Sequence, residues 1–201
     1  MPKGFYFLIG AQFASALADN ALLILGIYFL SEQGYPGWWA PLLKFSLTLA
    51  YVVLASVVGP VADAFHKRRL MAVMNALKML GVFFLLSGAH PVVAFAVIGL
   101  AASVYAPSKY GLLTETVPGH MLVRANAWLE VSVVLSVIFG IALGGALTGV
   151  SETAAKIDFS WMSLLGINVG VTTQTLPAMA VVLCIYLIAA VLNLGLHQMG
   201  Q

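Results

Sequence analysis

The sequence predicts an all-α integral membrane protein with six transmembrane helices. Of its 201 residues, 62% are hydrophobic and only 8% are charged, whereas a soluble domain carries about a quarter charged residues. This composition excludes a water-soluble enzyme and a disordered chain. A crossing takes about 20 apolar residues, so the chain is long enough for roughly six. Because apolar and polar residues do not alternate as in barrel strands, the crossings are expected to be helices.

Turn-forming residues separate the first three expected spans. The first, at 4–30, ends before the segment Ser-Glu-Gln-Gly-Tyr-Pro-Gly, whose residues favour turns. The second, at 39–59, ends before a proline. The third, at 70–87, ends before Gly-Ala-His-Pro. Each of these stretches therefore ends at residues that interrupt a helix.

The last three expected spans are longer and less sharply bounded. The fourth covers 92–113 and includes Pro107, the fifth covers 125–150, and the sixth covers 177–196. Residues 151–176 are polar at both ends, and their apolar part is too short to cross a bilayer. We expect them to form a surface connection with an interfacial segment rather than a seventh span.

Basic residues predict the orientation of the six spans. Six crossings place the N-terminus and the second and fourth connections on one side, together with six basic residues, whereas the other side holds Lys156 alone. The positive-inside rule then puts both termini in the cytoplasm. A net charge of +2 is too small to indicate a nucleic-acid partner. The six basic residues are Lys3, Lys67, Arg68, Arg69, Lys109 and Arg124.

Charged side chains inside the spans are the most informative feature. Each costs about 2.5–3.5 kcal/mol in mid-span if unpaired, so such residues usually face the bundle interior. Asp19 lies about 20 Å from the outer end of its helix and Lys78 about 13 Å from the inner end of its own. Both are therefore near the midplane and are able to meet. The charged residues within spans are Asp19, Lys44, Lys78 and Glu130.

A polar stripe accompanies these charges on the first span. Gln12, Ser15 and Asp19 follow one another at helical spacings and share a face. One interpretation is a buried ion pair that only fixes helix packing; the other, which we favour, is a polar translocation path. The candidate path comprises Gln12, Asp19, Asn20, Asn75, Lys78 and Glu130.

Glycines at four-residue spacing mark the fifth span. Gly140 and Gly144 form one pair, and Gly145 and Gly149 form a second. Such pairs let helix backbones approach closely. Plain packing explains them, and close contacts that let helices rock against each other are the functional alternative.

The connection between the second and third spans contains a recognisable motif. The simpler interpretation is a capped turn whose basic residues only follow the positive-inside rule. However, a glycine, an aspartate four residues later and a basic cluster resemble the signature loop of the major facilitator superfamily, in which these charges hold the cytoplasmic side closed. Ala64 and His66 depart from that pattern. The residues of this expected gating loop are Gly59, Asp63, Lys67, Arg68 and Arg69.

Four further stretches resemble one branch of that superfamily, the bacterial lysophospholipid transporters. They are 11–23, 75–81, 105–111 and 124–130, and the third contains the family loop motif Lys109, Tyr110 and Gly111. The resemblance implies inward movement of lysophospholipids, chiefly lysophosphatidylethanolamine, across the bacterial inner membrane. It also implies an acyltransferase/acyl carrier protein synthetase as a partner. In such a site Lys78 would face the phosphate and Asp19 the ammonium group of the cargo.

The resemblance extends to the amino-terminal six-helix half of a major facilitator superfamily fold. Residues 1–201 are expected to form that single repeat, with the carboxy-terminal half absent, so the partner is the missing half or a second copy. The alternative function is half of an exporter of drugs or small metabolites; a scaffold subunit is a further alternative. We expect no enzyme, no cofactor and no metal site, because no Ser/His pair or metal-spaced His/Asp set is present.

Overall fold

The computed structural model of the chain describes residues 1–154 and 171–195, except for the side chains at positions 55, 61, 63, 154 and 171–174. Within these residues the protein is helical and contains no strand, which confirms the predicted fold class. The elements are α1 (Lys3–Glu32), α2 (Trp39–Ala64), α3 (Lys67–Leu86), α4 (Pro91–Thr116), the short 3₁₀ helix η1 (Gly119–Met121), α5 (Leu122–Ala154) and α6 (Val171–Gly195).

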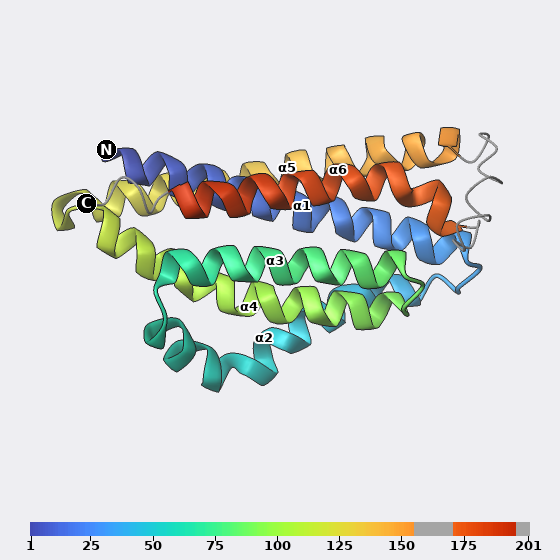
Figure 1. Cartoon of the computed structure of the whole chain (residues 1–201), viewed down its shortest axis with the longest axis horizontal. Helices are drawn as coiled ribbons and strands as arrows, with labels where there is room; N and C mark the ends of the chain where they lie inside the picture. Colours follow the sequence, from blue (N-terminus) through green and yellow to red (C-terminus); the bar gives the residue numbers. More distant parts are fainter. Residues whose placement is uncertain (155–170, 196–201) are drawn as a thin grey trace.

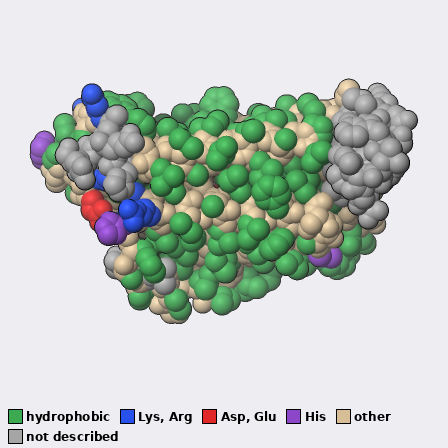
Figure 2. All heavy atoms as spheres, viewed as in Figure 1, with side chains coloured by type: hydrophobic (Ala, Val, Ile, Leu, Met, Phe, Trp, Pro, Cys, Tyr) green, Lys and Arg blue, Asp and Glu red, His purple; other side chains and the backbone are tan. Residues whose placement is uncertain are grey.

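Length and composition make this a multi-pass membrane protein. Five of the described helical segments are long and apolar enough to cross a bilayer, and α2 contributes a shorter apolar segment, Trp39–Leu54. Hydrophobic side chains cover the middle of the face drawn in Figure 2, whereas charged ones gather mainly at the end that holds the N-terminus. This distribution is typical of a bundle whose middle contacts lipid and whose ends contact water.

The helices form two groups of three. Figure 1 shows α1, α5 and α6 on one side of the bundle and α2, α3 and α4 on the other. Within the first group α1 packs on both α5 and α6; within the second, α4 packs on both α2 and α3. The strongest contact between the groups joins α3 to α6, whereas α1 and α4 touch only lightly. The light contact between α1 and α4 leaves room for a cavity between the two groups.

One of the two expected glycine pairs lies at a helix contact. A Cβ atom at Gly140 would lie 2.7 Å from the Leu17 carbonyl oxygen, and one at Gly144 would lie 2.9 Å from that of Ala21. These glycines let α5 pack backbone to backbone on α1. In contrast, a Cβ at Gly145 or Gly149 would meet nothing within 4 Å, because residues one position apart face different sides of a helix.

The expected loops are shorter than the sequence indicates. Helix α2 continues through Pro60 to Ala64 and α3 begins at Lys67, so only two residues connect them. Likewise α4 continues through Pro107 to Thr116, so the Lys109–Gly111 motif is helical and not a loop. Proline removes a single backbone donor, which membrane helices tolerate. Of the connection expected at 151–176, the interfacial segment lies outside the described residues.

Candidate functional site

A buried ion pair joins α1 to α3 near the middle of the bundle. The Lys78 Nζ atom lies 2.7 Å from the Asp19 Oδ2 atom, as the depth estimates for the two residues predict. The Lys78 side chain is only 2% exposed and that of Asp19 is 28% exposed. Withdrawing two charged groups from water to this extent costs desolvation free energy, unless further hydrogen bonds satisfy the two groups.

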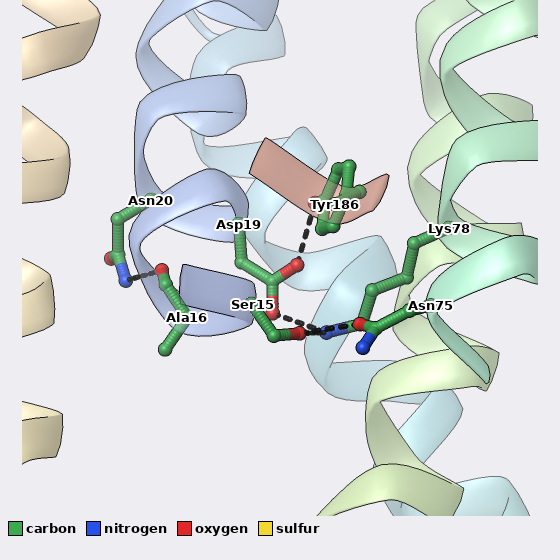
Figure 3. A network of polar contacts seen from close by, with 7 residues as sticks. All are labelled: Ser15, Ala16, Asp19, Asn20, Asn75, Lys78 and Tyr186. Carbon is green, nitrogen blue, oxygen red and sulfur yellow. Dashed lines mark hydrogen bonds and ion pairs between the residues drawn. The ribbon is translucent and has the colours of Figure 1, made fainter. Parts of the chain in front are cut away.

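Three neighbouring side chains supply hydrogen bonds around this pair (Figure 3). Lys78 Nζ also donates to Ser15 Oγ at 2.9 Å, and Ser15 Oγ donates to Asn75 Oδ1 at 2.7 Å. From α6, the Tyr186 hydroxyl donates to Asp19 Oδ1 at 2.6 Å. The network forms because Ser15 and Asp19 are four residues apart on α1, and Asn75 and Lys78 are three apart on α3, so each pair projects from one helix face.

Two aromatic rings complete the surroundings of the ammonium group. Lys78 Nζ lies 4.8 Å from the centroid of the Tyr105 ring of α4 and 5.8 Å from that of Tyr186. Both distances are within the range of a cation–π interaction. Lys78 is therefore stabilised by a carboxylate, a hydroxyl and two ring faces, which explains how a lysine is retained at this depth.

A small polar cavity opens beside the ion pair. Its volume is about 110 Å³, enough for a few water molecules at about 30 Å³ each. Residues of α1, α2, α3 and α4 contribute to it, so it lies on the face where α1 and α4 touch only lightly. Its lining consists of Gln12, Ser15, Ala16, Asp19, Tyr51, Lys78, Ala102, Tyr105, Ala106 and Lys109.

Asn20 does not belong to this cavity, although the sequence places it beside Asp19. Its Nδ2 atom donates to the Ala16 carbonyl oxygen of its own helix at 2.8 Å, and Figure 3 shows it pointing away from the ion pair. Its Cβ faces α5, where it would contact a side chain at Gly140. Adjacent residues are about 100° apart around a helix, so Asn20 cannot share the face of Asp19. Gln12 does line the cavity and donates to Ser132 Oγ of α5 at 3.5 Å.

Glu130 lies outside the cavity and is linked to the family motif. The Tyr110 hydroxyl donates to Glu130 Oε1 at 2.6 Å, which joins α4 to α5. Lys109 connects the two regions because it lines the cavity and its Nζ atom lies 5.0 Å from the Tyr110 ring centroid. Glu130 is exposed and does not line the cavity. It continues the series of polar residues from the cavity toward the end of the bundle.

One of the expected gating residues, Lys67, meets the family motif at the end of the bundle that holds the N-terminus. Lys67 Nζ lies 2.7 Å from Glu115 Oε1, which ties the start of α3 to the end of α4. The stem of Lys67 crosses Gly111, where an added Cβ would lie 2.5 Å from Lys67 Cε. Arg68 and Arg69 occupy the first turn of α3. Gly59 and Asp63 lie on α2, and the side chain of Asp63 lies outside the described residues.

Three polar residues of the site were not among the predicted ones. They are Tyr105, Tyr186 and Asn193; the first and last have buried polar atoms without a hydrogen-bond partner in the described part of the chain. Tyr186 and Asn193 were detectable, because they interrupt an otherwise apolar span at a spacing of seven residues and so share a face. Among the described residues there is no cluster of His, Cys, Asp or Glu that could hold a metal ion.

The bundle and its buried ion pair define a polytopic membrane protein with a polar interior, and comparison with known proteins identifies the family. The model of the Major Facilitator Superfamily matches residues 8–195, so the chain belongs to that superfamily. No solved structure matches the chain significantly.

Within the superfamily the chain is similar to lysophospholipid transporters. It is 42% identical to the lysophospholipid transporter LplT of Cronobacter sakazakii over 145 residues, which are 72% of this chain and 36% of that protein. It is 40% identical to LplT of Citrobacter koseri over 77% of this chain and 39% of the relative. It is 38% identical to LplT of Yersinia pestis over 78% of this chain and 36% of the relative. The matched part thus spans less than two fifths of the length of these curated relatives.

Proposed function

We propose that this chain provides the amino-terminal six-helix half of a transporter that moves lysophospholipids of the lysophosphatidylethanolamine type inward across the bacterial inner membrane. The observation that carries the proposal is the Asp19–Lys78 ion pair beside a polar cavity. The similarity to lysophospholipid transporters supports the choice of cargo. Transport, and not catalysis, is the function of those relatives by name.

The ion pair suits a zwitterionic headgroup. A phosphate can accept hydrogen bonds from Lys78 Nζ, and an ethanolamine ammonium can donate to Asp19. When the ion pair separates, each of its two groups is left as a buried, unpaired charge. A cargo that carries both a negative and a positive group can pair with each of them and so offset this desolvation cost. A cavity of about 110 Å³ holds part of a headgroup only, so the acyl tail stays against apolar helix surfaces or in the bilayer.

The other polar residues extend this site toward the end that holds the N-terminus. Gln12, Asn75 and Lys109 continue the route from the ion pair, and Tyr110 with Glu130 lies beyond them. Asn20 is left out of the route. The Lys67–Glu115 pair, with Arg68 and Arg69 beside it, holds this end closed when the opposite side is open.

The orientation and partners follow from the same proposal. Basic residues concentrate at the end that holds the N-terminus, which we place in the cytoplasm. A second six-helix half, or a second copy of this chain, completes the cargo route. An acyltransferase/acyl carrier protein synthetase then consumes the lysophospholipid that reaches the cytoplasmic leaflet.

Uptake of labelled lysophosphatidylethanolamine tests the proposal. The chain is produced together with the carboxy-terminal half of LplT from Cronobacter sakazakii in a bacterium that lacks its own lysophospholipid transporter. We expect uptake with the unaltered chain and a loss of at least tenfold with Lys78→Ala, because one partner of a buried pair is worth several kcal/mol. Lys44→Ala is the matched control, since Lys44 is an exposed lysine of α2 outside the cavity.

Two results would contradict the proposal. One is the absence of uptake when both halves are present in the membrane. The other is full uptake by Lys78→Ala at normal protein level. Proton-coupled export of a drug or small metabolite without lysophospholipid uptake would instead support the exporter alternative.

A further inference from the structure

A second, larger pocket lies at the end of the bundle that holds the N-terminus, between the first turns of α1 and α5. Its volume is about 320 Å³, and none of its lining residues belongs to the cavity beside the ion pair. The lining consists of Met1, Phe5, Tyr6, Ile9, Arg124 and Trp128. The transport route proposed above makes no use of it.

The lining combines apolar and aromatic walls with one cationic side chain. Phe5 is buried, whereas Tyr6 and Trp128 are 63% and 53% exposed and border the opening. Arg124 is the only charged side chain among the described residues that line the pocket. Neither ion pair found in the described part of the chain involves its guanidinium group. Five N–H donors are thus available beside an apolar hollow.

The lengths of the helices place this pocket at the level of lipid headgroups. With 30 and 33 residues, α1 and α5 are about 45 and 50 Å long, whereas the hydrocarbon core is about 30 Å thick. Each helix end therefore extends roughly 8–10 Å into the headgroup layer. Arg124 lies in the first turn of α5, and Ile9 lies about 9 Å from the start of α1. The pocket spans the depth from a lipid phosphate to its first acyl carbons.

We propose that this pocket binds an anionic phospholipid of the surrounding leaflet, with its phosphate on Arg124 and its glycerol and first acyl carbons against Phe5, Ile9 and Trp128. Arginine holds phosphate oxygens bidentately, and basic pockets between membrane helices are typical sites for anionic headgroups. Exposed Tyr and Trp are the residues that favour this interfacial layer. The volume is within the range of small-ligand sites.

The lining also indicates the kind of headgroup. No carboxylate is present among the described lining residues, so an ethanolamine ammonium would have no acceptor side chain there. The pocket therefore selects phosphatidylglycerol over phosphatidylethanolamine, the opposite of the zwitterion-matching Asp19–Lys78 pair. The site depends on the membrane location of the protein and not on its cargo.

Lipid binding to the protein in nanodiscs tests this assignment. Binding of phosphatidylglycerol and of phosphatidylethanolamine is measured by native mass spectrometry for the unaltered protein and for Arg124→Gln. We expect Arg124→Gln to weaken phosphatidylglycerol binding by roughly ten- to hundredfold, the value of charge-assisted hydrogen bonds, and to weaken phosphatidylethanolamine binding much less. Lys3→Gln is the matched control, because it removes an exposed cation of the same end that does not line the pocket.

Ile9→Trp provides a second variant if Arg124→Gln fails to fold. It fills the pocket while the guanidinium group remains, so phosphatidylglycerol should be displaced. Equal losses with Lys3→Gln and Arg124→Gln would overturn the site in favour of diffuse attraction by the basic end. Equal binding of both lipids would also overturn it. Loss of lysophospholipid uptake with intact phosphatidylglycerol binding would contradict the proposed function but not this site.

Discussion

The carboxylate of Asp19 accepts hydrogen bonds from two other helices, through Lys78 of α3 and Tyr186 of α6. A single side chain of α1 therefore fixes the position of two neighbours. Such a residue can serve packing, transport or both, and the two roles respond differently to substitution. An apolar replacement of a whole buried pair often preserves stability, whereas removal of one partner leaves an uncompensated charge.

Asp19→Asn and the double change Asp19→Leu with Lys78→Met separate these roles. We expect the single variant to lower the free energy of unfolding by about 3 kcal/mol, because Lys78 is left buried and unpaired. The double variant should regain most of that stability and still fail to transport. Denaturation in detergent measures the first quantity and lysophospholipid uptake the second. A double variant that transports normally would show that the pair serves packing alone.

Asn193 presents a different case, since its side chain is fully buried and neither its amide oxygen nor its amide nitrogen has a hydrogen bond of good geometry among the described residues, although it lies beside the Tyr105 hydroxyl. Asn193→Leu keeps the branched shape of the side chain and removes the unsatisfied groups, so it should raise the free energy of unfolding by about 1–3 kcal/mol. Tyr186→Phe is the control, because it removes an existing hydrogen bond to Asp19 and should therefore lower the free energy of unfolding. A less stable Asn193→Leu protein in thermal denaturation would contradict this expectation.

At the scale of helices, the contact of α5 with α1 depends on two glycines. Gly140→Ala places a methyl group 2.7 Å from the Leu17 carbonyl oxygen, so the helices must separate. We expect a loss of about 1–3 kcal/mol in the free energy of unfolding, the usual cost of overpacking. Gly145→Ala is the matched control on the same helix. It has open space and should be neutral or stabilise the helix by up to about 1 kcal/mol.

The sequence predicts the positions of the helices better than it predicts which face of each helix packs against which neighbour. Apolar length reveals the six helices, and depth from the helix ends brings Asp19 and Lys78 together, because both depend on composition and on a fixed rise per residue. The choice between Gly140 and Gly145, or the direction of Asn20, depends on which neighbour packs on each face. That is a property of the assembled bundle, as is the meeting of Lys67 with Gly111 across two helices.

For the whole molecule, the distribution of basic residues predicts the topology. In a Cys184→Ser background, Glu32→Cys and Lys3→Cys place single thiols at opposite ends of α1, where both native residues are exposed. A membrane-impermeant maleimide applied to spheroplasts should label Glu32→Cys at once and Lys3→Cys only after permeabilisation. Cys184 must be removed first because it is itself exposed. The reverse labelling pattern would contradict the predicted orientation.

The two groups of three helices are held together differently along their length. Near the middle, α1, α3 and α6 share the Asp19 network. At the end that holds the N-terminus, the Tyr110–Glu130 hydrogen bond joins α4 to α5 across the two groups, whereas the Lys67–Glu115 pair joins α3 to α4 within one group. An exposed pair such as Lys67–Glu115 is worth at most about 1 kcal/mol, and because it lies within one group it does not hold the two groups together.

The stem of Lys67 lies across Gly111 on its way to Glu115, so a longer side chain at 111 would push the lysine off its carboxylate. A bulkier residue at 111 requires the flexible end of the Lys67 side chain to move. During divergence, substitutions at 111 and at 67 should therefore be coupled. Two motifs that are 44 residues apart in the chain would then be inherited as one unit, whatever the cargo of the descendant protein.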